Sequence, residues 1–99
     1  MSIVLIGPPA AGKSRVGKRL ARRLGLAYVD TDAMIVRDHG AIADIFAVHG
    51  EERFRALERT AVEVALREDA VVSLGGGAVL DPLTQNDLRG RVVVLLTIR

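Results

Sequence analysis

The sequence predicts an α/β protein in which helices cover both faces of a parallel sheet. Short apolar runs alternate along the chain with longer stretches whose apolar residues recur every three or four positions. The apolar runs lie at 3–6, 26–30, 70–74 and 92–96, and they contain few polar residues, as expected for strands that are buried on both faces. Strands that alternate with helices are typical of parallel sheets, because each parallel connection needs a crossover.

The predicted helices occupy the intervals between these runs. Between residues 12 and 24, Val16, Leu20 and Leu24 recur every four residues while basic residues take the other faces, and Gly25 supplies a stop signal. The other helical segments are expected at 33–39, 41–48, 51–67 and 82–88. No repeat, linker or low-complexity tract interrupts this pattern, so we expect one layered α/β sandwich.

Length and composition fit a single domain with an aliphatic core. The chain has 99 residues, of which 49% are apolar and 3% aromatic. It contains no cysteine, which excludes disulfides and thiolate metal sites and fits a cytoplasmic protein. No apolar stretch approaches the roughly 20 residues of a membrane helix. The formal charge is only +2, and the basic cluster at 15–23 lacks interleaved aromatic residues, so we expect neither a membrane nor a nucleic-acid partner.

The stretch GPPAAGKS, residues 7–14, lies between the first predicted strand and the first predicted helix. It matches GxxxxGK[ST], whose glycines let backbone amides approach a phosphate. Lys13 would carry a mobile charge to the β- and γ-phosphates, and Ser14 would offer a hydroxyl to Mg²⁺. The alternative is an accidental glycine loop with a surface lysine, which the strand and helix on either side disfavour. We therefore expect a nucleoside triphosphate held by Gly7, Ala10, Ala11, Gly12, Lys13, Ser14 and Arg15.

Two carboxylates follow the second predicted strand, in the stretch YVDTDAM. Ligands of open α/β sheets bind outside the carboxyl ends of the strands, so Asp30 and Asp32 should face the same crevice as the phosphate loop. One could hold Mg²⁺ through its waters while the other handles a hydroxyl acceptor. The alternative is that Thr31 or Asp32 only caps the next helix. No aspartate ends the third strand, which reads VVSLGGGAV, so Asp30 is the available metal candidate.

Two further stretches contain candidate substrate contacts. Gly75, Gly76 and Gly77 follow the third strand, where backbone amides could approach a small molecule, although a plain turn is the alternative. In GEERFRALE, Arg55 and Glu58 are neighbours on one helix face. A surface ion pair is the simplest interpretation of these two, but an arginine in an acceptor pocket would suit a carboxylate-bearing substrate.

Together these stretches resemble the shikimate kinase family. The resemblance lies in GPPAAGKS, VDTDAMI, IADIF with HGEERFRALE, and VVSLGGGAV, in that order, and it covers the whole chain. Many nucleoside triphosphatases share the first motif. The D-x-D pattern narrows the choice to kinases of small molecules, and SLGGGAV is the most discriminating stretch.

The resemblance implies that Mg-ATP phosphorylates the 3-hydroxyl of shikimate. Lys13 and Ser14 would then serve the phosphates and magnesium, with Asp30 supporting the metal. Asp32 would bind the ring hydroxyls and accept the proton, and Arg55 would hold the substrate carboxylate. The remaining pocket positions implied by the resemblance are Phe46, Phe54, Glu58, Gly75, Gly76 and Gly77.

The resemblance also implies a fold: one nucleoside-monophosphate-kinase-like phosphate-loop domain over 1–99, truncated at the C-terminus, with strand order 2-3-1-4 and the fifth strand missing. Family members continue with a mobile lid arginine, a helix, a fifth strand and a second carboxylate-binding arginine, and Arg99 occupies neither arginine position. The complete protein would be a monomer, whereas this chain could self-associate through its fourth strand. Two alternatives stay open: a non-catalytic ATP- or phosphate-binding fragment, and a kinase for another polyol such as gluconate.

Overall fold

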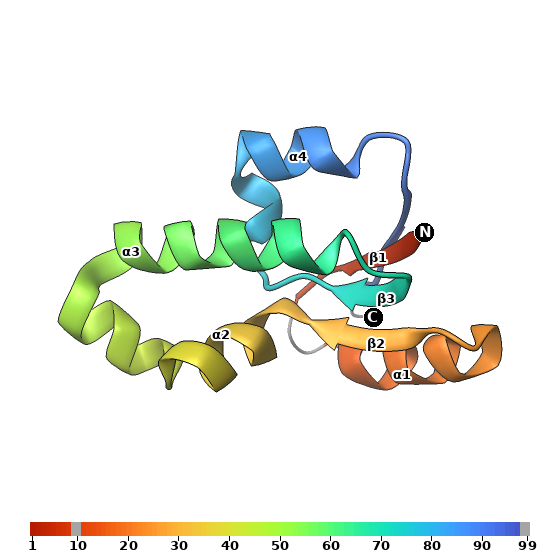
Figure 1. The fold of residues 1–99 in the computed structure, drawn as a ribbon, viewed down its shortest axis with the longest axis horizontal. Coiled ribbons are helices and arrows are strands. Elements are labelled where there is room, and N and C mark those ends of the chain that lie inside the picture. The colour runs from red at the N-terminus through yellow and green to blue at the C-terminus, as the bar shows by residue number, and fades with distance from the viewer. Residues whose placement is uncertain (9–10, 98–99) are drawn as a thin grey trace.

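Four parallel strands form the centre of the molecule, in the order β2-β3-β1-β4 (Figure 1). The computed structural model describes residues 1–8 and 11–97. The strands are Ser2–Ile6 (β1), Ala27–Asp30 (β2), Ala70–Ser73 (β3) and Val92–Leu95 (β4). The central strand β1 pairs in parallel with β3 and β4, so that Val4 lies opposite Val72 on one side and Val93 on the other. The predicted α/β class and the 2-3-1-4 order are confirmed.

Helices cover both faces of this sheet. They are α1 (Lys13–Leu24), α2 (Thr31–His39), α3 (Ile42–Ala65), the 3₁₀-helix η2 (Ala78–Leu80) and α4 (Pro82–Leu88). Figure 1 shows α1 on one side of the sheet and α3 and α4 on the other. Val71 belongs to the apolar cluster of the α1 side with Ala21, and its neighbour Val72 belongs to the opposite cluster with Val62. Burial on both faces explains the uninterrupted apolar runs of β1 and β3. The expectation that the run at 92–96 is equally buried is wrong, because β4 is exposed.

The helix boundaries follow local signals in the sequence. Gly50 interrupts α3 with φ 82° and ψ 173°, a conformation that glycine adopts readily, and it separates the two expected helical segments. Asp81 caps α4 by accepting a hydrogen bond from the amide of Leu83 at 2.8 Å, with Pro82 in the first turn. The helix η2 has no counterpart among the predicted elements, because three residues are too few to show a period. None of the helices in the described ranges is long and apolar enough to span a bilayer.

A third apolar cluster lies between α2 and α3. Ile35 of α2 packs there with Ile45, Phe54 and Ala61 of α3, and all four are buried. This cluster fixes α2 against α3, and α2 begins directly after Asp30. The packing of these two helices therefore sets where the two carboxylates of the sequence can lie.

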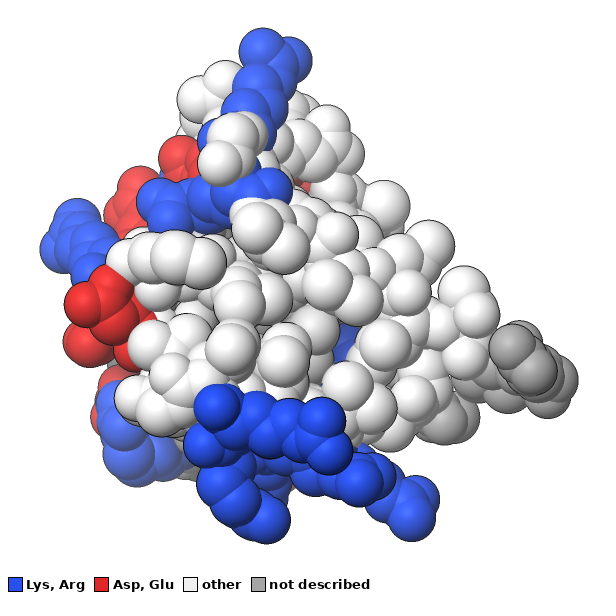
Figure 2. Space-filling model, turned by 90° about the vertical axis from the view of Figure 1, so that its right-hand side faces the viewer, with Lys and Arg blue, Asp and Glu red and all other residues white. Residues whose placement is uncertain are grey.

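The outer strand β4 is exposed along its length. Val92, Val93, Val94 and Leu95 keep 54, 38, 37 and 63% of their surface exposed. Within the described part of the chain, β4 pairs with β1 alone. Figure 2 shows a broad uncharged surface on this side of the molecule, with Lys and Arg side chains along its lower and upper borders. An open apolar strand edge offers unpaired N–H and C=O groups to another strand.

We expect a polypeptide of residues 1–99 to self-associate through β4 as its concentration rises. Val92→Lys should move association to higher concentration, since a charge on an edge strand opposes pairing with a second chain. Val48→Lys is the matched control, because Val48 is 74% exposed on α3 and should leave association unchanged. Sedimentation velocity over a concentration series measures the effect. A parent chain that stays a folded monomer at every concentration would contradict this expectation.

Candidate functional site

The phosphate loop joins the carboxyl end of β1 to the start of α1. Gly12 is the residue before the helix, with φ 80°, and it provides no side-chain cap. The first turn of α1 also contains no acidic residue, so its free N–H groups are available to an anion. Lys13 is nearly buried, and its Nζ donates a hydrogen bond to the carbonyl oxygen of Gly7. The ammonium group therefore lies over the loop, next to the helix terminus.

The other predicted phosphate contacts differ in their surroundings. Ser14 and Arg15 are exposed in the first turn of α1. The amide of Ala11 donates to the carbonyl of Pro8 at 3.0 Å, so in this conformation it serves the turn of the loop. Ala10 was also expected to contact phosphate, and it lies outside the described residues.

Asp30 ends β2 and caps α2. Its Oδ1 accepts a hydrogen bond from the amide of Ala33 at 3.1 Å. The alternative that Thr31 or Asp32 caps this helix is therefore wrong, because the helix already begins at Thr31 and its cap is one residue earlier. Asp30 also borders a cavity of about 170 Å³ at the carboxyl edge of the sheet. The residues that line this cavity are Lys13, Ser14, Asp30, Asp32, Leu74 and Gly76.

Thr31 ties the ends of β2 and β3 together. Its side chain is fully buried, its Oγ1 accepts from the amide of Gly75 at 3.1 Å, and it lies 3.4 Å from the carbonyl oxygen of Ser73, to which it can donate. This hydroxyl thereby holds residues 75–77, here called the glycine loop, against the start of α2. Sequence reasoning considered Thr31 only as a helix cap. A hydroxyl between two aspartates is the only signal of this role in the sequence.

Asp32 presents a carboxylate oxygen that has no partner. Its Oδ1 is buried and makes no hydrogen bond within the described residues. An ideal Cβ placed on Gly75 would overlap this carboxylate, so only glycine permits the loop to come this close. Burial raises the pKa of Asp32, and the nearby Asp30 raises it further, while Lys13 and Arg55 act in the opposite direction. An unpaired buried acceptor of this kind suits a hydrogen-bond donor supplied by a ligand.

Arg55 lies at the other end of the glycine loop. A Cβ on Gly77 would overlap its guanidinium group, which also lies 3.1 Å from Glu58 and 5.3 Å from the ring centroid of Phe54. Phe54 in turn packs against Phe46 with 4.8 Å between ring centroids. The glycine loop thus contacts Asp32 at one end and Arg55 at the other, and it joins the two predicted parts of the site.

Glu58 is buried, with 5% of its side chain exposed, although its partner Arg55 is 41% exposed. The interpretation of these two residues as a surface ion pair is therefore wrong for Glu58. Burial raises the pKa of Glu58, the hydrogen bond from Arg55 opposes that shift, and the charges of Asp32 and Asp81 add to it. The buried carboxylate of Glu58 thus accepts a hydrogen bond from the partly exposed guanidinium of Arg55 at 3.1 Å.

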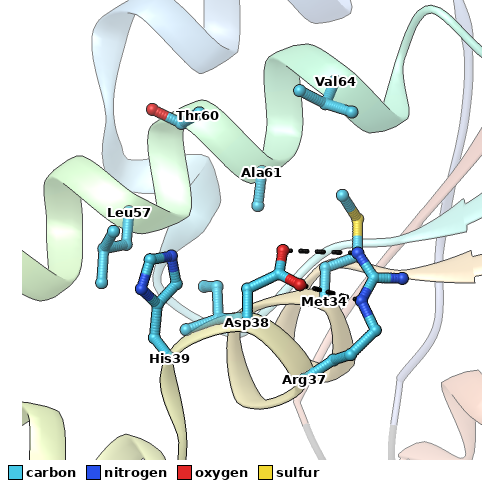
Figure 3. Close-up of a pocket in the computed structure, with 9 residues that line it drawn as sticks. Met34, Arg37, Asp38, His39, Leu57, Thr60, Ala61 and Val64 are labelled. Atoms are coloured by element: carbon cyan, nitrogen blue, oxygen red, sulfur yellow. Dashed lines mark hydrogen bonds and ion pairs between the residues drawn. The ribbon is translucent and has the colours of Figure 1, made fainter.

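A larger cavity, of about 340 Å³, lies between α2 and α3 (Figure 3). Met34, Leu57, Ala61 and Val64 give it a largely apolar wall. Arg37 and Asp38 at its border are exposed and form an ion pair with each other. No residue of the phosphate loop lines this cavity. The smaller cavity at the strand ends is the candidate site, because cationic and acidic groups converge there beside free helix amides.

The groups in and beside this site suit charged and hydroxyl-bearing ligands. Lys13 and the start of α1 suit phosphate oxygens. Asp32 suits a hydroxyl, and Arg55 suits a carboxylate. Within the described part of the chain no three His, Cys, Asp or Glu side chains cluster as a metal site. Any divalent ion here would take most of its ligands from water and phosphate, as Mg²⁺ commonly does.

Comparison with known proteins gives a consistent result. Residues 9–99 match the family described as "Shikimate kinase". The chain is 53% identical over 97 residues to the shikimate kinase of Mycobacterium leprae and 54% identical over 97 residues to that of Thermobifida fusca. These alignments cover 96% of this chain, and 49% and 56% of the two relatives. The chain therefore spans about half the length of the curated relatives it matches.

Solved structures agree with the fold. Shikimate kinase from Acinetobacter baumannii in complex with shikimate superposes with a TM-score of 0.91 at 38% identity. The match covers 99% of this chain and 56% of the Acinetobacter baumannii chain. Shikimate kinase from Aquifex aeolicus superposes with a TM-score of 0.90 at 34% identity, and the match covers 100% of this chain and 61% of the Aquifex aeolicus chain. The four-stranded sheet with its order 2-3-1-4 is thus that of known shikimate kinases.

Asp32→Asn should be more stable than the parent protein, and this difference in the free energy of unfolding should grow as pH increases. The raised pKa of Asp32 means that the folded state binds this proton more readily than the unfolded chain. The stabilising contribution of the protonated group is complete below its ordinary value of 3.8 and is lost as pH rises through the folded pKa. Thermal unfolding of parent and variant between about pH 3 and pH 7 measures the difference.

Asp38→Asn provides the opposite control. The hydrogen bond from Arg37 lowers the pKa of the exposed Asp38, so this variant should lose stability relative to the parent as pH rises. A constant difference between Asp32→Asn and the parent at every pH would show that the charge of Asp32 costs the folded state nothing.

Proposed function

The chain belongs to the shikimate kinase family, and we propose that it carries the phosphate-binding and acceptor-binding residues of an ATP-dependent kinase that phosphorylates the 3-hydroxyl of shikimate. The observation that supports this most directly is the glycine loop. Its backbone meets the unpaired carboxylate of Asp32 at Gly75 and the guanidinium of Arg55 at Gly77. Asp32, which would accept a hydrogen bond from a substrate hydroxyl, and Arg55, which would bind a substrate carboxylate, are thereby held at a fixed separation beside Lys13.

In this proposal Lys13 and the first amides of α1 bind the phosphates of ATP. Lys13 exchanges its hydrogen bond with the Gly7 carbonyl for the β- and γ-phosphate oxygens. The charge on the transferred group is then stabilised by groups that are already in place. Gly7, Ala10, Ala11, Gly12, Ser14 and Arg15 complete the proposed phosphate contacts.

Ser14 and Asp30 fit a magnesium ion that is shared with the phosphates. Both side chains line the same cavity as Lys13 and Asp32. A donor set of one hydroxyl and one carboxylate is small, which suits an ion that keeps several waters and binds phosphate oxygens. When bound, the ion neutralises charge on the triphosphate. Asp30 has the structural task of capping α2 as well, so its position is fixed before any ion binds.

The acceptor pocket extends from Asp32 to Arg55. The unpaired Oδ1 of Asp32 accepts a hydrogen bond from the substrate hydroxyl and takes up its proton as the phosphoryl group is transferred. Arg55, held by Glu58, binds the substrate carboxylate. The proposed pocket is completed by Phe46, Phe54, Gly75, Gly76 and Gly77. The shikimate complex of the Acinetobacter baumannii relative supports shikimate as the acceptor.

Lys13→Ala should weaken ATP binding by about 10- to 100-fold, the effect of removing a hydrogen bond of roughly 1.5–3 kcal/mol to a charged group. Lys18→Ala, which removes the other lysine of the chain, should leave ATP affinity unchanged. Calorimetric titration with ATP and Mg²⁺ measures both. Equal affinities in the parent and in Lys13→Ala would refute the phosphate-loop assignment.

Two further variants separate the roles in the acceptor pocket. In a kinase completed with the carboxyl-terminal segment of a relative, Asp32→Asn should lower kcat by about 10²- to 10⁴-fold, since it removes a proton acceptor. Arg55→Ala should mainly raise KM for shikimate, by about 10- to 100-fold, since it removes ground-state binding. Coupled detection of ADP release measures both.

The same assay tests the two alternatives. Turnover with gluconate and not with shikimate would identify a kinase for another polyol. ATP binding by the 99-residue chain with no turnover in the completed enzyme would identify a non-catalytic nucleotide-binding module.

A further inference from the structure

Arg59 and Asp87 form an ion pair between α3 and α4 that the proposed function leaves without a role. Nη2 of Arg59 lies 2.5 Å from Oδ2 of Asp87 and 3.3 Å from Oε1 of Glu63. The arginine side chain is only 16% exposed. Its Nε and Nη1 are buried, and within the described residues neither has a hydrogen-bond partner.

This pair is a poor source of stability. A guanidinium withdrawn from water needs all of its donors satisfied to recover the lost hydration, and the N–H groups on two of the three nitrogens of Arg59 are not. Apolar residues of similar volume often replace a buried ion pair without loss of stability. A role in positioning neighbouring groups therefore explains the contact between Arg59 and Asp87 better than a role in stabilising the fold.

Asp87 lies near the end of a segment that starts at the candidate site. This segment, which we call the glycine arm, comprises residues 75–88: the three glycines, η2 and α4. Ala78 and Leu88 pack it against the apolar cluster of Val62 and Ala65 on α3. Two polar contacts add to this packing, because Gly77 borders the guanidinium of Arg55 and Asp87 binds Arg59. Arg55 and Arg59 are four residues apart, so their side chains leave the same face of α3 one turn apart.

The far end of the glycine arm is also tied to the sheet. The carbonyl oxygen of Asp87 accepts a hydrogen bond from Nε of Arg91 at 2.9 Å, and Nη1 of Arg91 donates to Oγ of Ser2 at 2.8 Å. Asp87 thus joins α3, through its carboxylate, to the start of β1, through its carbonyl. The arm has little freedom to slide along α3 while both contacts of Asp87 are made.

We infer that Arg59 is a positioning residue for Arg55: by holding Asp87, it keeps the glycine arm aligned along α3 so that Gly77 stays against the Arg55 guanidinium. Gly77 then limits the movement of that guanidinium on one side, and Glu58, Phe54 and Glu51 also contact it. Arg55 then stays beside the glycine loop, where the proposed function places the substrate carboxylate. This inference rests on the proposed function for the assignment of Arg55 to the substrate carboxylate.

The decisive variant is Arg59→Met combined with Asp87→Leu, studied in the 99-residue chain at concentrations where it is monomeric. The Gly77 amide and the Arg55 Nε–Hε signals in ¹⁵N–¹H spectra should shift or broaden, while the core amides of Val4 and Val72 keep their positions. The melting temperature should stay equal to that of the parent or rise. Arg59→Lys, which keeps the charge opposite Asp87, should restore the Gly77 and Arg55 signals in part.

The matched control is Arg37→Met combined with Asp38→Leu, which removes an exposed ion pair on α2. It should leave the Gly77 and Arg55 signals unchanged. Unchanged Gly77 and Arg55 signals in the Arg59/Asp87 double variant, or its global unfolding, would overturn the inference, because the pair would then be either irrelevant to Arg55 or purely structural.

A titration with shikimate, carried out in the kinase completed with the carboxyl-terminal segment of a relative, separates this inference from the proposed function. The Arg59/Asp87 double variant should bind shikimate at least fivefold more weakly than the parent, and Arg59→Lys should lie between them. Absence of shikimate binding in the parent would count against the proposed function, while the NMR comparison would still decide whether Arg59 positions Arg55. Equal shikimate affinity in parent and double variant would overturn the positioning role.

Discussion

The parallel direction of all four strands is the constraint on which the candidate site depends. Carboxyl ends of parallel strands meet at one edge of the sheet, so the loops after β1, β2 and β3 must converge there. Each of these loops contributes one kind of group: a lysine with free helix amides, two carboxylates, and a run of glycines. An antiparallel partner for β1 would have put the phosphate loop and the aspartates at opposite edges.

Convergence alone would leave the three loops as neighbours without fixed distances. The buried hydroxyl of Thr31 closes the gap between β2 and β3 by bonding to both sides of the strand end, at Ser73 and Gly75. The absence of side chains in the glycine loop then lets backbone reach Asp32 and Arg55 directly. The site is therefore assembled from main chain on one side and charged side chains on the other. Rigid backbone contributes geometry here that a flexible side chain could supply only at an entropic cost.

Local patterns in the sequence predict most of the fold and the outline of the site. Uninterrupted apolar runs predict the strands, and the eight residues 7–14 predict a phosphate loop, because both signals are local. The features that sequence reasoning missed depend on distant partners. Thr31 bonds to groups 42 and 44 residues away, and nothing nearby predicts that. Glu58 pairs with Arg55 at a spacing typical of exposed helix faces, yet it is buried, and the local pattern gives no sign of that.

The position of β1 at the centre of the sheet has a consequence for the order in which the chain can fold during synthesis. Its two partners come much later along the chain, since Ile3 pairs with Val71 and with Val92. The cluster between α2 and α3 needs only residues 35–61, and contacts so close in sequence form quickly. The lobe that bears Asp32 and Arg55 can therefore close on a nascent chain while β1, although synthesised first, is still an unpaired apolar strand. Until β3 emerges, that strand is the part of the protein that most needs protection from other chains.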